Sequence, residues 1–177
     1  MDVETLQAKA DRGDATAQCN LGLMYTDGRG VAKDEARAVE LWQAAADQGH
    51  AGAQFDLGLM YAFGRGVAKD EARAVQLWQA AADLGFAGAQ VLLGRLYATG
   101  RGVAKDEARA VQLYQAAADQ GLADAQGRLG AMYAFGRGVA KDEARAMQLY
   151  QATRARGSPS ATCTRTGTAS QRTRRPR

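Results

Sequence analysis

Residues that could do chemistry recur along this chain at a fixed spacing. The segment G-R-G-V-A-K-D-E-A-R-A begins at Gly28, Gly64, Gly100 and Gly136, and places a glycine-rich turn with a lysine before each expected helix. A phosphate-binding loop needs a longer turn and a Ser or Thr after its Lys, and this segment has neither. We therefore interpret the segment as a linker between helices.

The carboxylates and the histidine also fail to form a catalytic or metal-binding set. Each unit carries an Asp-Glu pair beside Lys and Arg, first at Asp34 and Glu35. Such pairs are typical of helix starts, where Asp caps free N–H groups and Glu faces the positive end of the helix dipole. His50 is the only histidine, and we expect it at a variable surface position. We assign no catalytic, cofactor-binding or metal-binding residue, and predict that the protein is not an enzyme.

The units that position these residues are 36 residues long, and each predicts two helices. The first helix carries apolar residues on one side and ends at glycine, while the second begins at the Asp-Glu pair and carries its own apolar stripe. The expected core of the first unit is Ala17, Leu21, Met24 and Tyr25, then Ala38, Leu41, Trp42 and Ala45. Trp78, Tyr114 and Tyr150 are expected in the core at the position of Trp42.

The units cover almost the whole chain. They span 14–49, 50–85, 86–121 and 122–157, and residues 1–13 match the second half of a unit. Helices this short are marginal alone, so each unit is expected to need the next one to cover its apolar face. The sequence therefore predicts an all-α solenoid of antiparallel helix pairs.

Residues 158–177 depart from the repeat and account for the positive net charge. Seven arginines and no acid follow residue 152, whereas residues 1–152 hold 16 basic and 19 acidic residues, a formal charge of −3. One interpretation is a disordered basic arm that contacts nucleic acid or acidic lipid. The other is a fifth repeat read out of frame, because permitted codons for 158–175 can encode G-N-G-V-A-K-D-E-A in a shifted frame.

The order A-x-A-Q-x-x-L-G-x-M-Y-x-x-G-R-G-V-A-K-D, closed by L-W-Q-A-A-A-D-x-G, closely resembles the Sel1-like repeat, a relative of the tetratricopeptide repeat. The resemblance implies a right-handed superhelix whose usual work is to hold other proteins together. Some cysteine-rich relatives are described as β-lactam-binding or hydrolysing, and they carry a pair of cysteines in each repeat. This chain has only Cys19 and Cys163, which argues against that activity.

Differences between the copies predict where a partner binds. The variable positions fall on the side of each first helix opposite the expected core, and the family places this helix along the concave groove. Drift on an exposed face would also scatter changes there, yet several of the variable residues are apolar. The predicted partner-binding residues are Asn20, Leu23, Asp27, Asp56, Leu59, Phe63, Leu92, Arg95, Thr99, Arg128, Ala131 and Phe135.

These observations favour a monomeric scaffold that binds a protein or peptide on its concave face. We expect no cofactor, no specific nucleic acid and no membrane insertion, and the absence of a visible signal or transmembrane segment favours the cytoplasm. The alternatives are a β-lactam-binding or hydrolysing enzyme, and a truncated fragment without function. A saturable partner would exclude the last, and turnover of a β-lactam would support the enzyme.

Overall fold

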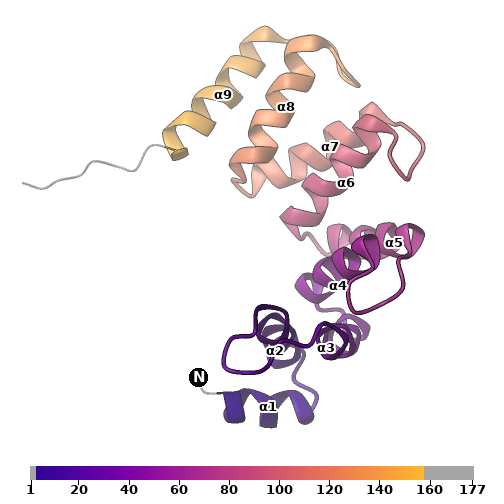
Figure 1. Ribbon diagram of the computed structural model, residues 1–177. Coiled ribbons are helices and arrows are strands. Elements are labelled where there is room, and N and C mark those ends of the chain that lie inside the picture. Colours follow the sequence, from indigo (N-terminus) through magenta and orange to yellow (C-terminus); the bar gives the residue numbers. More distant parts are fainter. Residues whose placement is uncertain (1–2, 158–177) are drawn as a thin grey trace, which may run out of the picture.

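The computed structural model describes residues 3–157, and the regular elements in that range are α-helices (Figure 1). The predictions for the C-terminal segment concern residues 158–177, which lie outside the described residues. The helices are α1 (Val3–Asp11), α2 (Ala15–Asp27), α3 (Glu35–Asp47), α4 (Ala51–Phe63), α5 (Glu71–Asp83), α6 (Ala87–Thr99), α7 (Glu107–Asp119), α8 (Ala123–Phe135) and α9 (Glu143–Gly157).

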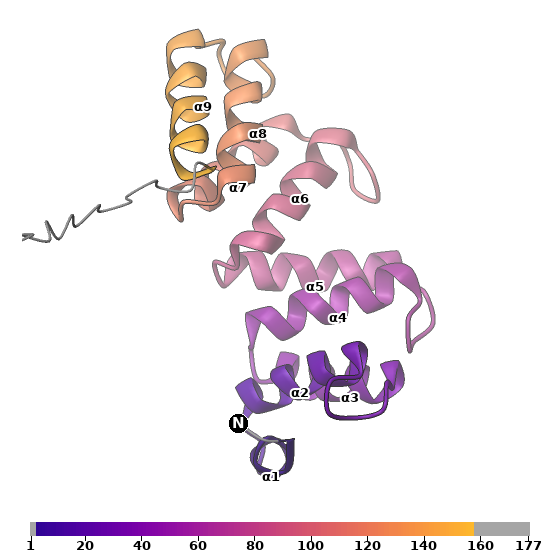
Figure 2. The same cartoon turned by 60° about the vertical axis from the view of Figure 1, so that its left-hand side comes forward.

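The helices stack in chain order, so that each packs on its neighbours in the sequence. Figures 1 and 2 show α1 at one end of the stack and α9 at the other, with the helix direction turning from one pair to the next. Each pair (α2 with α3, α4 with α5, α6 with α7, α8 with α9) is joined by a linker, and the linkers are residues 28–34, 64–70, 100–106 and 136–142. The predicted all-α solenoid is confirmed.

Local sequence explains where the helices begin and end. Asp34 has an extended backbone, and its carboxylate accepts a hydrogen bond of 2.9 Å from the Arg37 amide, as predicted for a capping residue. Gly28 ends α2 in the left-handed conformation, with φ of 69°, which favours glycine. The surface position expected for His50 is wrong: it is half-buried, and its Nδ1 accepts a hydrogen bond of 3.1 Å from the Ala53 amide at the start of α4.

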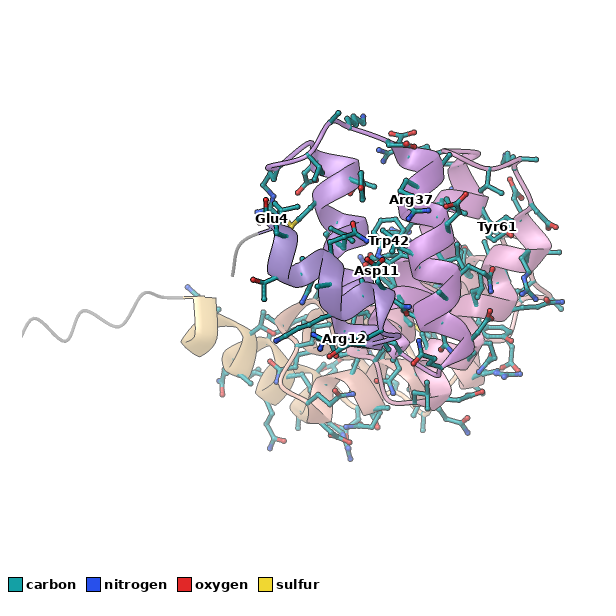
Figure 3. All side chains as sticks on the ribbon, turned by 90° about the horizontal axis from the view of Figure 1, so that it is seen from below. Glu4, Asp11, Arg12, Arg37, Trp42 and Tyr61 are labelled. Carbon is teal, nitrogen blue, oxygen red and sulfur yellow. The ribbon has the colours of Figure 1, made fainter. Side chains whose placement is uncertain are left out.

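The core runs along the stack as a series of clusters between successive helices. Trp42 is 3% exposed, lies among the helices, and donates an indole hydrogen bond of 3.1 Å to the Cys19 carbonyl (Figure 3). Glycine at position 22 leaves room for this indole, since a Cβ there would lie 2.9 Å from its Cε2 atom. Met24 and Tyr25, expected in the core, are only half-buried. The largest fully buried side chains are Leu21, Leu57, Leu93 and Leu129.

Tyr150 is more exposed than predicted for a core residue. Trp42, Trp78 and Tyr114 are buried, whereas Tyr150 at the same repeat position is 40% exposed. The first helix of the following repeat covers this position in the earlier pairs, and within residues 3–157 no helix follows α9. The burial of this aromatic residue therefore depends on the next repeat.

A glutamine pair joins the two helices of a repeat at the end of the second helix. The Gln48 amide donates to Gln18 Oε1 at 2.8 Å, and Gln120 donates to Gln90 Oε1 at 3.0 Å. Leu84 occupies the same position after α5 and is exposed. The equivalent acceptor in this repeat, Gln54 Oε1, is buried and has no hydrogen-bond partner among the described residues.

Replacing Leu84 with Gln is therefore expected to stabilise the protein by about 1 kcal/mol, because the new amide would satisfy a buried acceptor. The backbone at Leu84 (φ −79°, ψ 3°) already matches that at Gln48 (φ −86°, ψ 4°). Urea unfolding followed by circular dichroism measures the change. Gln48→Leu is the matched control and should destabilise by about the same amount; no gain from Leu84→Gln would contradict the pairing.

Candidate functional site

The predicted partner-binding residues lie on the first helices α2, α4, α6 and α8, but they are not equally exposed. The exposed members are Asn20, Leu23, Asp27, Phe63, Arg95, Thr99 and Phe135, and the half-buried members are Asp56, Leu59, Leu92, Arg128 and Ala131. The expectation that this whole side of the helix takes no part in the fold is wrong for Leu59 and Leu92, which pack against the core cluster around Trp78. They pack there because neighbouring repeats meet along this edge of the helix.

Five of these residues come together in one cavity. It has a volume of about 490 Å³ and lies between α4, α5, α6 and the linker that follows α6. The predicted residues in its wall are Leu59, Phe63, Leu92, Arg95 and Thr99. Ala62, Glu71, Ala74, Val75, Trp78, Leu96, Arg101 and Gly102 complete the lining. Its walls are mainly apolar, with charged groups from Arg95, Arg101 and Glu71.

The remaining predicted residues are not part of this cavity. Asn20 and Leu23 line a separate depression of about 270 Å³ with Met24 and Arg29. The Arg128 guanidinium is held by the Asp124 carboxylate of its own helix at 3.0 Å. Helical spacing places all of these residues on one side of the first helices, but it does not show which of them share a cavity.

Sequence reasoning missed the contribution of α5 and the linker to the cavity. It assigned Trp78 to the core and the linker arginines to a turn, because both recur in equivalent form along the chain. In the structure Trp78 is 6% exposed and also forms part of the cavity wall. Arg101 and Gly102 line the same cavity, although their linker sequence is identical to that of the other repeats. Nothing in the local sequence could have identified them.

Two phenylalanines are the most exposed large apolar side chains of the described residues. Phe63 is 70% exposed at the end of α4, and Phe135 is 75% exposed at the equivalent end of α8. Asp27 and Thr99 occupy the same position in α2 and α6. Burial of a phenyl ring is worth roughly 1.5 to 3 kcal/mol, so both rings offer binding energy that the fold does not use.

Asp56 is the one predicted residue with a strongly altered acidity. Burial raises the pKa of its carboxyl from 3.8 to about 6. Burial, together with the nearby Asp56 carboxylate, raises the pKa of the Cys19 thiol to about 11. A thiol with so high a pKa is held in its unreactive protonated form at neutral pH.

Asp56→Asn is expected to stabilise the protein at about pH 8 by about 1 kcal/mol and to have little effect near pH 4. The folded state binds the Asp56 proton more tightly than the unfolded state does, so the carboxyl costs stability as pH rises from about 4 to above 6. Solvent contact screens part of this cost. Asn20 already occupies the position in α2.

Urea unfolding at the two pH values measures this difference. The control is Asp27→Asn, which removes an exposed carboxylate that pairs with Arg29 at 3.1 Å and so measures the effect of losing a surface charge. An effect of Asp56→Asn that does not grow between about pH 4 and about pH 8, or equal effects of both substitutions, would contradict a raised pKa at Asp56.

The cavity and its surroundings offer contact surface and charge. Among residues 3–157, no group of three or more His, Cys, Asp and Glu side chains is placed to hold a metal ion. None of the helices in that range is both long and apolar enough to cross a membrane. Stacked helix pairs with side-chain grooves between repeats define the class of α-solenoid repeat proteins.

Within this class, the chain belongs to the Sel1 repeat family. The family model matches four successive segments, residues 15–50, 51–86, 87–122 and 123–158. Sel1 repeat proteins are generally scaffolds for protein–protein interaction. No curated protein matches the chain significantly in sequence.

Solved structures agree with this assignment. The chain is 37% identical to c5321, described as a protective antigen of uropathogenic Escherichia coli with an SLR fold, over 89% of this chain and 34% of that one, with a TM-score of 0.84. It is 37% identical to a Sel1 repeat protein from Oxalobacter formigenes over 86% of this chain and 61% of that one, with a TM-score of 0.76. The chain thus spans about a third and three fifths of the lengths of these two proteins.

A cysteine-rich relative is more distant. Helicobacter pylori cysteine rich protein B is 25% identical over 71% of this chain and 95% of that one, with a TM-score of 0.57. Cys19 is the one free cysteine in the described part of this chain, and it is buried. The enzyme alternative based on cysteine-rich relatives is therefore not favoured.

Proposed function

We propose that the protein is a non-enzymatic, monomeric scaffold that binds a protein or peptide segment along the face formed by α2, α4, α6 and α8, the concave face of the solenoid. The observation that carries this proposal is the exposure of Phe63 and Phe135, at 70% and 75%, at one repeat position on this face. Exposed aromatic side chains on a concave surface are the residues that commonly anchor a partner.

Two further observations support a protein partner. The cavity beside Phe63 is mainly apolar, with Leu59 and Leu92 in its wall, which suits the apolar side chains of a polypeptide. Residues 1–152 have a formal charge of −3, which is unfavourable for binding the phosphates of a nucleic acid.

The test is selection of peptides from a displayed random library on the immobilised protein, followed by affinity measurement with the purified peptides. We expect saturable binders that lose at least about tenfold in affinity when Phe63 and Phe135 are both replaced by Ser. Thermal stability should change little, because both side chains are exposed.

Leu84→Ser is the matched control, since it removes an apolar side chain that is 56% exposed at the end of α5, away from the proposed face. Selected peptides should bind this variant and the wild type equally. Failure to select any saturable peptide, or binding that survives the double Phe63 and Phe135 substitution, would overturn the proposed function.

A further inference from the structure

Linker arginines tie neighbouring repeats together at two places. Arg65 Nη2 lies 2.6 Å from Glu35 Oε1 at the start of α3, and Arg137 Nη2 lies 3.0 Å from Glu107 Oε1 at the start of α7. We call these the first and third linker contacts. Each joins a linker to the second helix of the preceding repeat, and both use residues that recur in the same order along the chain.

The second linker contact, between residues 100–106 and the start of α5, lacks this ion pair. Within residues 3–157, the Arg101 side chain makes no ion pair, and Glu71 pairs with Lys69 of its own linker at 2.6 Å. The Glu71 side chain is 65% exposed, against 26% for Glu35 and 24% for Glu107. The same residue types are present, but Arg101 acts on Glu71 only at longer range and forms no ion pair with it.

Glycines show independently that the second contact is open. A Cβ on Gly66 would overlap the Glu35 carbonyl, and one on Gly138 would overlap the Glu107 carbonyl, because the linker backbone presses on the preceding helix. A Cβ on Gly102 would meet no heavy atom within 4 Å. The linker after α6 therefore stands away from α5, and Figure 2 shows α6 running away from α5 toward its C-terminal end.

At the opposite, N-terminal end of α6, two aromatic residues meet where the equivalent positions of the other repeats carry other residue pairs. The rings of Phe55 and Phe86 lie 5.2 Å apart at the N-terminal end of α6, where the neighbouring junctions carry Cys19 with His50 and Val91 with Leu122. The 490 Å³ cavity occupies the end where the linker is lifted, and Glu71, Arg101 and Gly102 line it. Its volume is in the range of roughly 300 to 1,000 Å³ found for ligand pockets.

We propose that this open second linker contact binds a partner segment in which a large apolar side chain enters the cavity and an adjacent carboxylate pairs with Arg95 and Arg101. The inference deepens the proposed function and rests on it. The partner's carboxylate pairs with the linker arginine, as Glu35 and Glu107 do at the first and third linker contacts. Its apolar side chain packs against Trp78 and Leu92.

Charge decides between the occupants that could fill such a cavity. Among the described residues, neither Arg95 nor Arg101 makes an ion pair; the nearby Glu71 carboxylate pairs with Lys69, and Arg101 attracts it at longer range. The rim is therefore positive and favours an acidic partner. Residues 158–177 of this chain carry arginine and no acid, so they have the same sign as the rim.

The test is titration of the full ¹⁵N-labelled protein with an amidated synthetic peptide that has one Phe followed by two Glu, monitored by NMR. We expect saturable shifts confined to the amides of α4, α5, α6 and residues 99–102. Peptides with Gln in place of Glu, or Ala in place of Phe, should bind at least about tenfold more weakly.

Arg95→Gln combined with Arg101→Gln should weaken the Phe-Glu-Glu peptide at least about tenfold, and Arg73→Gln, an exposed arginine outside the cavity, should not. Equal binding of the Gln peptide, shifts centred on Phe135, or tighter binding of a Phe-Lys-Lys peptide would overturn this site. Dimer formation that the double Arg variant abolishes would overturn it in favour of a second copy of the chain.

The outcomes separate this inference from the proposed function. Library peptides that depend on Phe135 and not on Arg95 or Arg101 would leave the proposed function standing and overturn the site between α5 and α6. A Phe-Glu-Glu peptide that shifts no resonance would also overturn this site, whatever the library yields.

Discussion

Gly66→Ala is expected to lower the free energy of unfolding by about 3 kcal/mol. Gly66 has φ of 66°, a backbone conformation that costs energy for any residue with a side chain. Its new Cβ would also overlap the Glu35 carbonyl and lie 2.9 Å from the Ala36 amide nitrogen. Relief requires the linker to move off α3, which would break the Arg65–Glu35 ion pair of the first linker contact. Urea unfolding followed by circular dichroism measures the loss.

Gly102→Ala is the matched control for this substitution. Gly102 occupies the same linker position with φ of 71°, but a Cβ there would meet no heavy atom within 4 Å. It should therefore cost only the conformational part, about 1 kcal/mol. If both substitutions destabilise the protein equally, the second linker contact is closed in solution, and the cavity beside Arg101 is lost with it.

Trp42→Ala is expected to destabilise the protein by about 4 kcal/mol. The indole is 3% exposed, packs from α3 against α2 and α4, and donates a hydrogen bond to the Cys19 carbonyl. Its removal leaves a large cavity and loses this hydrogen bond, and each carries its own cost. Thermal and urea unfolding measure the change.

Tyr150→Ala provides the comparison at the same repeat position. Tyr150 is 40% exposed on α9, so its removal should cost about 1 kcal/mol, well below the loss at Trp42. A loss at Tyr150 as large as that at Trp42 would mean that the α9 aromatic is covered in solution.

Most of the fold could be predicted from the sequence because each repeat carries the same residues that begin, end and bury its helices. Asp34 predicts a helix start, Gly28 predicts a left-handed helix end, and the apolar spacing identifies Leu21 as core. Failures occurred where a residue depends on its neighbour in the stack. Tyr150 is exposed because no described helix covers it, and His50 caps a helix because its ring nitrogen can replace a carboxylate.

The candidate site was only partly predictable for the same physical reason. Helix geometry placed Phe63, Leu92 and Arg95 on related faces, and the structure brings them into one cavity. The opening of the second linker contact was not predictable, since Arg101 and Glu71 stand in repeated segments identical in sequence to those of the closed contacts. Packing at the far end of α6, where Phe55 meets Phe86, distinguishes this junction from the others.

The open second linker contact also bears on how the solenoid comes apart. In a repeat array, cooperativity depends on the coupling between adjacent repeats, and each missing interaction weakens one coupling. The coupling between α5 and α6 lacks the ion pair and the close linker backbone that its neighbours have. Amide hydrogens on either side of this boundary should therefore exchange as two separate groups, so that the N-terminal and C-terminal halves behave as distinct unfolding units.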